Sequence, residues 1–255
     1  FDEFSVLWLV LHASRFQHPQ TGSCVLDDWK QKAEESGERV LGALRGGVQS
    51  ALESLGWGFL NHPANGALRE ALQGGQLSRQ QFHEQLLRLV YRFLFLFTAE
   101  DRDLLFPREV DKGDPRRRIY REGYSVSRLR ELAIKRSAYE GDYGDLWELQ
   151  RLVFQQLSIG NSPLGLPGLG GLFSLEQCPD LQGAELWNGP LLRAIKAIGW
   201  FDAGGTFTRV RYRDLNTEEL GSVYEGLLEL HPQLEQQGNQ WRLSYGGGAG
   251  SDRKT

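Results

Sequence analysis

One stretch of the sequence constrains the fold more than any other. Residues 80–106 read QQFHEQLLRLVYRFLFLFTAEDRDLLF, and their apolar side chains recur around almost the whole circumference of a helix. A helix on the surface needs a polar face toward water, so a helix of this kind has to be surrounded by others. We therefore expect it to begin after a cap at Ser78, to stop at Pro107, and to lie in the centre of a helical bundle.

Further segments show the three- and four-residue apolar spacing that predicts helices. The last of them opens with a capping box, in which Asn216 is the cap and Glu219 is the third helical residue. We also expect a turn at 56–65 and an extended segment at 206–212. The expected helices are 1–11, one from a cap at Asp27 or Asp28 to Leu55, one capped by Ser125 or Ser127, 145–157, 189–198 and the helix after Asn216.

The segment GNSPLGLPGLGGLFS, residues 160–174, holds five glycines and two prolines, too many backbone breakers for a helix. The expected fold is therefore mainly α, a multi-helix bundle with a Gly/Pro-rich loop region and little or no β-sheet. The tail from Tyr245 resembles a linker in composition. The predicted organisation is N-terminal helices at 1–75, a central helical core at 76–160 with a basic segment at 102–136, a Gly/Pro-rich loop with short elements at 161–215, and a connector helix with a linker at 216–255.

The composition is that of a globular chain able to bury a core, with 40% apolar and 24% charged residues. Cys24 and Cys178 stand alone, which excludes a disulfide framework and a CxxC motif and favours a reducing cytoplasm. The longest apolar stretch, 86–99, is interrupted by Arg88 and Arg92 and is shorter than the roughly 18 to 20 residues that a membrane span needs. We expect no membrane segment.

The charge is unevenly distributed along the chain. Residues 102–136 hold eleven basic and six acidic side chains, a net +5, so the remainder of this −4 chain carries −9. Most of the basic residues are arginine, the side chain better suited to bidentate phosphate or carboxylate contacts. The segment is explained either by a solvated helical face with salt bridges or by contact with a nucleic-acid backbone.

No familiar catalytic motif is evident. The five histidines are scattered, so we expect no metal site, and no nucleophile-elbow sequence is present. The glycines of 164–171 follow a helix and include Pro167, so a structural loop is the better interpretation than a dinucleotide loop. Asp28-Trp29-Lys30 has the D-x-K spacing of restriction-type nucleases, but Asp28 falls at a helix start rather than on a strand.

Several blocks of the chain, in order, resemble the region that precedes the methyltransferase core in large adenine-specific DNA methyltransferases. These enzymes belong to restriction-modification and phage-defence systems and include the fused type IIG restriction enzymes and the DISARM and BREX methylases. The last block is the most specific. The blocks are LLRLVYRFLFLFTAEDRDLL (86–105), YSVSRLREL (124–132), DLWELQRLVF (145–154), LGLPGLGGLF (164–173), LWNGPLLRAI (186–195) and YRDLNTEELGSVYEGLLEL (212–230).

The resemblance implies that this chain is a fragment of a longer methyltransferase. In that family a GSYYTP-like segment that contacts S-adenosylmethionine follows the last block, and this chain stops at GSDRKT, where that segment would begin. The family's glycine-rich cofactor loop and its NPPY tetrapeptide, which holds the flipped adenine, have no counterpart here. No catalytic, cofactor-binding or metal-binding residue can be carried over, and S-adenosylmethionine is expected only for the parent protein.

We therefore expect a non-catalytic helical connector that positions the methyltransferase domain on double-stranded DNA and contacts that domain and, in some systems, defence subunits. The arginines could instead pair with Asp111, Asp114, Glu122 and Glu131. A second hypothesis is a protein-interaction module that recruits defence partners without touching DNA; a third is a nuclease with a degenerate motif. The candidate DNA-backbone contacts are Arg116, Arg117, Arg118, Arg121, Arg128 and Arg130.

Overall fold

The computed structural model describes residues 4–6, 8, 12, 24–161, 163–202, 205–228, 230–238 and 240–246. The chain divides into two compact units, residues 1–43 and 44–255. The second unit contains the site described below. Most of the helix expected at 1–11 and the last nine residues of the expected linker lie outside the described residues.

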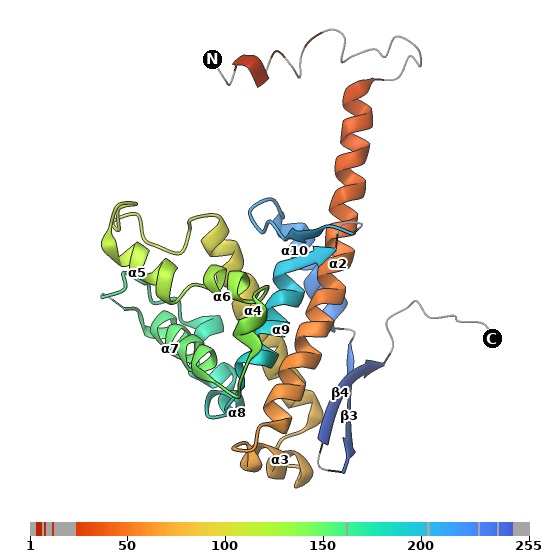
Figure 1. Cartoon of the computed structure of the whole chain (residues 1–255), viewed down its shortest axis with the longest axis vertical. Coiled ribbons are helices and arrows are strands. Elements are labelled where there is room, and N and C mark those ends of the chain that lie inside the picture. The colour runs from red at the N-terminus through yellow and green to blue at the C-terminus, as the bar shows by residue number, and fades with distance from the viewer. Residues whose placement is uncertain are drawn as a thin grey trace, which may run out of the picture. The chain divides into compact units, whose positions relative to one another are not determined.

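The architecture is mainly α, as predicted, with two small two-stranded sheets (Figure 1). The α-helices in chain order are α2 (Val25–Asn61), α3 (Gly66–Gln73), α4 (Arg79–Asp101), α5 (Pro115–Gly123), α6 (Val126–Leu132), α7 (Asp145–Ile159), α8 (Pro179–Gln182), α9 (Asn188–Gly199) and α10 (Thr217–Leu228). Short 3₁₀ turns are η2 (Arg136–Tyr139), η3 (Gly171–Phe173) and η4 (Leu175–Gln177). The strands are β1 (Trp200–Asp202), β2 (Phe207–Arg209), β3 (His231–Gln237) and β4 (Gln240–Gly246).

Helix α2 departs from the prediction at both ends. It begins before the expected aspartate cap, so Asp27 and Asp28 lie in its first turn, where negative charge favours the helix dipole. The predicted turn at 56–65 is wrong in its first half, because the helix continues to Asn61. The glycine at 58 serves close packing: a Cβ added to it would lie 2.5 Å from Leu186 Cδ1 and 2.6 Å from Pro190 Cβ.

Helix α4 is the buried centre that its sequence predicts. The Ser78 hydroxyl accepts from the Gln81 backbone N–H at 3.1 Å, and the Gln81 side chain accepts from the Ser78 N–H at 2.9 Å, which completes a capping box. Its core side chains include Phe82, Leu86, Val90, Phe93 and Phe97, all fully buried. The helix contacts α6, α8, η3 and β3, so the central and C-terminal segments share one core.

The expected stop of α4 at Pro107 is wrong, because the helix ends earlier, at Asp101. Asp103 takes a left-handed conformation (φ 56°), its N–H donates to the Glu100 carbonyl at 3.1 Å, and the Leu104 N–H donates to the Ala99 carbonyl at 2.8 Å. This is the Schellman arrangement, which satisfies the last carbonyls of a helix. The backbone therefore turns away six residues before the proline.

The Gly/Pro-rich segment is an ordered loop, as expected, and a buried arginine of α4 holds it in place. The guanidinium of Arg92, 2% exposed, donates to the carbonyls of Leu172 and Ser174, both at 2.9 Å. Burial lowers the pKa of Arg92. Two backbone hydrogen bonds of 2.9 Å between Asn161 and Leu166 close the first part of the loop.

The β3–β4 hairpin, like α3, α5 and β1, is not among the elements that the sequence predicts. Its strands pair antiparallel from His231 opposite Gly246 to Gln237 opposite Gln240, so Tyr245 and Gly246 belong to β4 and not to a linker. The side chain of Asn61 fixes the hairpin to the end of α2, since it donates to the Trp241 carbonyl at 2.8 Å and accepts from the Trp241 N–H at 2.9 Å.

Candidate functional site

The four residues at the carboxyl end of α4, Glu100 to Asp103, form a charged cluster, which we call the α4 cluster. The sequence places Glu100, Asp101 and Arg102 at the end of a buried helix, where charges cost free energy unless they are paired, and so it favours an internal salt-bridge knot over a signalling contact. In the structure Glu100 contacts α5 and α6, Asp101 contacts α6, β2 and Tyr212, Arg102 contacts Leu215, and Asp103 contacts α5. The cluster thereby joins α5, α6, β2 and the turn at 212–215 to the central helix.

Asp101 is the anionic centre of the predicted knot. Its carboxylate accepts from Arg130 Nη2 and Arg209 Nη2, both at 2.8 Å, and from the Tyr212 backbone N–H at 3.3 Å. Burial alone would raise the pKa of Asp101, but the two guanidinium groups outweigh it and the net shift is downward. The Arg130 guanidinium also lies 4.8 Å from the centroid of the Phe97 ring.

Glu100 has no ion pair among the described residues. Its carboxylate instead contacts the first residues of α6. One carboxylate oxygen accepts from the Tyr120 hydroxyl at 2.8 Å and the Val126 N–H at 3.0 Å, and the other accepts from the Ser127 N–H at 2.9 Å. Burial raises the pKa of Glu100 despite these bonds, and burial together with Glu100 raises that of Tyr120. The expectation of a salt bridge is therefore wrong for Glu100, because neutral donors, a hydroxyl and two backbone N–H groups, bind its carboxylate in place of a cation.

Asp103 and Arg102 complete the cluster. Asp103 accepts from Arg117 Nη1 at 2.7 Å, and Arg117 also donates twice to the Val110 carbonyl, at 2.7 and 3.0 Å. Arg102 donates to the carbonyl of Leu215. Together these contacts fix the loop between α4 and α5.

The six predicted DNA contacts divide into two groups. Arg117 and Arg130 are 7% and 1% exposed and are used internally, so they are not available to a phosphate in this structure. This corrects their assignment as backbone contacts. The cause is a pair of long-range partners, Asp103 and Asp101, which lie outside the set of acids considered from the sequence.

The other four arginines lie toward solvent. Arg116 Nη2 lies 2.6 Å from an oxygen of Asp114, the N-cap of α5, and hydrogen bonds from Arg116 lower the pKa of Asp114 to about 2. Arg128 is half-buried and donates to the Gly123 carbonyl at 3.2 Å. Arg118 and Arg121 are exposed and form no ion pair within the described residues. Among the four acids proposed as partners, only Asp114 forms an ion pair with any of these arginines in that part of the chain.

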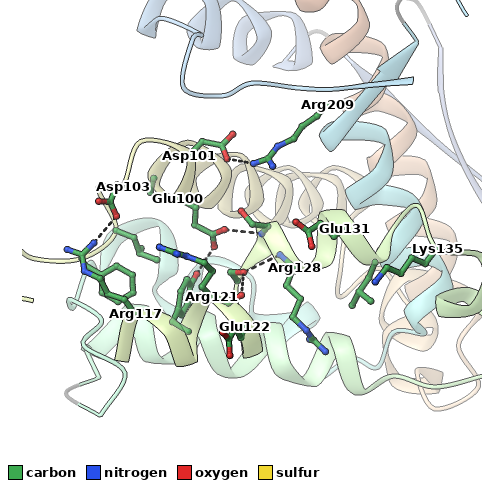
Figure 2. Close-up of a pocket in the computed structure, with 17 residues that line it drawn as sticks. Glu100, Asp101, Asp103, Arg117, Arg121, Glu122, Arg128, Glu131, Lys135 and Arg209 are labelled. Carbon is green, nitrogen blue, oxygen red and sulfur yellow. Dashed lines mark hydrogen bonds and ion pairs between the residues drawn. The ribbon is translucent and has the colours of Figure 1, made fainter. Parts of the chain in front are cut away.

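A cleft of about 710 Å³ opens beside the cluster, between the end of α4, α5 and α6 (Figure 2). We call it the α4–α6 cleft. Glu100 and Tyr120 belong to its lining, and so do Lys135, which follows α6, and Arg209 of β2. Lys135 and Arg209 were not among the predicted site residues. Lys135 lies beyond the end of α6 with an extended backbone, so no helical spacing could have placed it with Arg128.

Over 24–161 and the other described ranges, no group of three or more His, Cys, Asp or Glu side chains could hold a metal ion. Asp28 and Lys30 are exposed in the first turns of α2 and not on a strand. None of the described helices combines the length and hydrophobicity that a bilayer span requires.

Comparison with known proteins adds no relative: no family model, no curated protein and no solved structure matches this chain.

Proposed function

We propose that this chain is the non-catalytic helical connector of a site-specific adenine DNA methyltransferase of a restriction-modification or phage-defence system. In this proposal it holds the downstream methyltransferase domain on double-stranded DNA, and S-adenosylmethionine binds to that downstream domain. One observation supports the DNA contact: the basic segment is divided between buried arginines that tie α5 and α6 to α4 and arginines on the same two helices that are exposed or half-buried.

This division of the arginines matters because a connector has to hold the methyltransferase domain at a fixed place relative to the DNA. Arg117 and Arg130 fix the orientation of α5 and α6 through their carboxylate partners. The backbone that carries the exposed Arg118 and Arg121 and the half-buried Arg128 is therefore fixed as well. Arginine presents a planar fork of donors that matches phosphate oxygens. Neutralised phosphates release counterions, so this binding is expected to weaken steeply as salt rises.

A fluorescence-anisotropy titration against duplex DNA at several salt concentrations tests the proposal. Each lost phosphate contact lowers the slope of log K against log salt by about 0.9, so the variant Arg118→Ala/Arg121→Ala/Arg128→Ala should lose about 2 to 3 from the slope.

The matched control removes three other exposed arginines, at 211, 213 and 242, which belong neither to α5 nor to α6. The control should retain most of the slope. Absence of duplex binding at low salt, or equal losses in the two triple variants, would contradict the proposal.

A protein-interaction module remains the second candidate, and one surface favours it. A small apolar hollow of about 150 Å³ near the end of α4 is lined in part by Phe95, Leu104 and Leu169, which are 42%, 68% and 41% exposed. Apolar side chains exposed together are typical of protein contacts. Co-purification of a defence subunit that is lost in Leu104→Asp, with no salt-dependent DNA binding, would establish this function in place of the first.

A further inference from the structure

We propose that the β1–β2 hairpin binds a single-stranded nucleic acid, with one base stacked on Phe207 and a phosphate of the same strand on Lys196. This inference goes beyond the contact of duplex DNA with α5 and α6, and it does not depend on that contact, because neither residue belongs to those helices. The strand can be DNA or RNA, since both present a base and a phosphate.

The hairpin places two aromatic rings on one face. Trp200 lies opposite Arg209 in the antiparallel pairing, and Asp202 lies opposite Phe207. Opposite and alternate residues of such a pair share a face, so these four side chains lie together. The rings of Trp200 and Phe207 are parallel to within 6°, with centroids 5.6 Å apart. Parallel rings at that separation are offset, so each covers only part of the other, and Phe207 is 49% exposed.

The aromatic pair is fixed to the core. The Trp200 indole N–H donates to the Arg130 carbonyl at 3.1 Å. The Val210 N–H donates to the Gly199 carbonyl at 3.0 Å, which continues the pairing beyond the two strands. The ring of Phe207 therefore rests on a held partner, and a preorganised surface loses little conformational freedom when a ligand binds.

Positive charge lies on the same surface. Lys196 is exposed, and its Nζ lies 5.0 Å from the centroid of the Phe207 ring. Arg209 is exposed as well and, in the part of the chain that the structure describes, uses only Nη2, for Asp101. Residues 188–209 hold three basic side chains, at 193, 196 and 209, and one acidic side chain, a net +2, although the chain outside 102–136 carries −9.

The acidic residues near this face do not cancel its charge. The Asp202 carboxylate accepts from the Gly205 N–H at 2.6 Å and is thus bound to the backbone of its own hairpin. Asp101 is paired with both Arg130 and Arg209, so that group of three keeps a net positive charge. Together with Lys196, the face attracts a phosphate.

An exposed ring beside a cation favours a single strand over a duplex. In a duplex the bases stack on one another and show a protein only their edges in the grooves. In a single strand the face of a base is free, and proteins that bind single strands combine aromatic rings, on which bases stack, with cations that follow the backbone. Phe207 and Lys196 supply one of each.

A fluorescence-anisotropy titration of the full chain with a labelled oligothymidine of about ten nucleotides tests the inference. Phe207→Leu keeps an apolar cover on Trp200 but removes the ring, and it should weaken binding about fivefold or more, the low end for one stacked base. Phe207→Trp, which keeps a ring, should bind at least as tightly as the unaltered chain. Lys196→Ala should lower the slope of log K against log salt by about 0.7.

The matched controls remove an exposed ring and an exposed cation elsewhere. Tyr143→Leu and Arg79→Ala should leave binding of the oligonucleotide unchanged. Photo-cross-linking from a 5-iodouracil base, followed by mass spectrometry, should identify the peptide that contains Phe207. In a further arm oligouridine replaces oligothymidine: equal affinity assigns the site to both kinds of strand, and a preference assigns it to the preferred one.

The inference is overturned if the oligothymidine does not bind at low salt, if Phe207→Leu and Tyr143→Leu lose affinity equally, or if the cross-link lies elsewhere. Duplex binding that depends on the arginines of α5 and α6, without binding of the oligothymidine, would overturn this inference alone. Binding of the oligothymidine without duplex binding would overturn only the proposed duplex contact.

Discussion

The buried ion pair between Asp101 and Arg130 gives the sharpest test of how the α4 cluster holds the fold. Asp101→Asn keeps the size of the side chain but removes its negative charge. Arg130, 1% exposed, would then remain charged in the core with neutral acceptors only, the amide oxygen at position 101 and the Val210 carbonyl at 3.3 Å. Loss of one partner from a buried pair costs about 3 to 5 kcal/mol, because the other charge is left uncompensated.

We expect Asp101→Asn to lower the free energy of unfolding by about 3 kcal/mol. With a urea dependence of about 2 kcal/mol per molar, the midpoint of urea unfolding should fall by about 1.5 M. Circular dichroism, which follows the helices, measures it. The control is Asp114→Asn, at the half-buried pair with Arg116, where asparagine remains a good N-cap and the midpoint should move much less.

The double variant Asp101→Asn/Arg130→Met separates an uncompensated charge from lost packing. With both charges removed, the double variant should be more stable than Asp101→Asn alone, because no buried cation is left without a partner. If the losses of the two single variants simply add, or if Asp101→Asn costs less than about 1 kcal/mol, the pair does not hold α6 to α4.

Three further predictions concern other contacts. Because the pKa of Glu100 is raised in the folded protein, protonation of Glu100 stabilises the fold; this stabilisation is complete below the ordinary carboxyl pKa and is lost as pH rises through the folded pKa. The free energy of unfolding should therefore depend less on pH in Glu100→Gln, and an unchanged pH profile would refute this. Gly58→Ala should destabilise the fold by about 1 to 3 kcal/mol because its Cβ would overlap Leu186. Gly46→Ala, whose Cβ would have nothing within 4 Å, should instead stabilise α2 by about 0.5 to 1 kcal/mol. If Gly58→Ala unfolds at a higher temperature than Gly46→Ala, the packing of Gly58 is not what limits the residue there. Tyr245→Phe removes the hydroxyl that lies 3.0 Å from His83 Nδ1 and should cost about 1 kcal/mol, with faster hydrogen exchange in β4; exchange that does not change would show that this contact does not hold the hairpin.

The sequence predicted the helices wherever apolar spacing and a cap coincide. Ser78 caps α4, Ser125 caps α6, and the Asn216–Glu219 capping box is present, with reciprocal hydrogen bonds of 2.6 and 2.8 Å. These signals are local, because a cap bonds to backbone only a few residues away. The caps predicted from the sequence are therefore also present in the folded chain.

The errors arise where a residue's role depends on distant partners. Gly58 looks like a helix breaker until Leu186 and Pro190 are packed against it. The β3–β4 hairpin is rich in glutamine and has few apolar residues, so its alternation is weak, and its position depends on Asn61, 180 residues before Trp241. No periodicity within the segment could have indicated that contact.

The basic segment shows how this limit affects a functional prediction. Its net charge of +5 looks like a surface for nucleic acid, yet the two arginines least exposed to solvent are paired with carboxylates of the α4 cluster. A buried guanidinium needs such a partner, so part of the excess is a requirement of the fold. What remains for a ligand is the smaller set that is both exposed and unpaired, and its members differ in where they lie: Arg121 lines the α4–α6 cleft and Arg118 does not. For this reason substitutions of single arginines on α5, and not the total charge of the segment, test which of these side chains contacts duplex DNA.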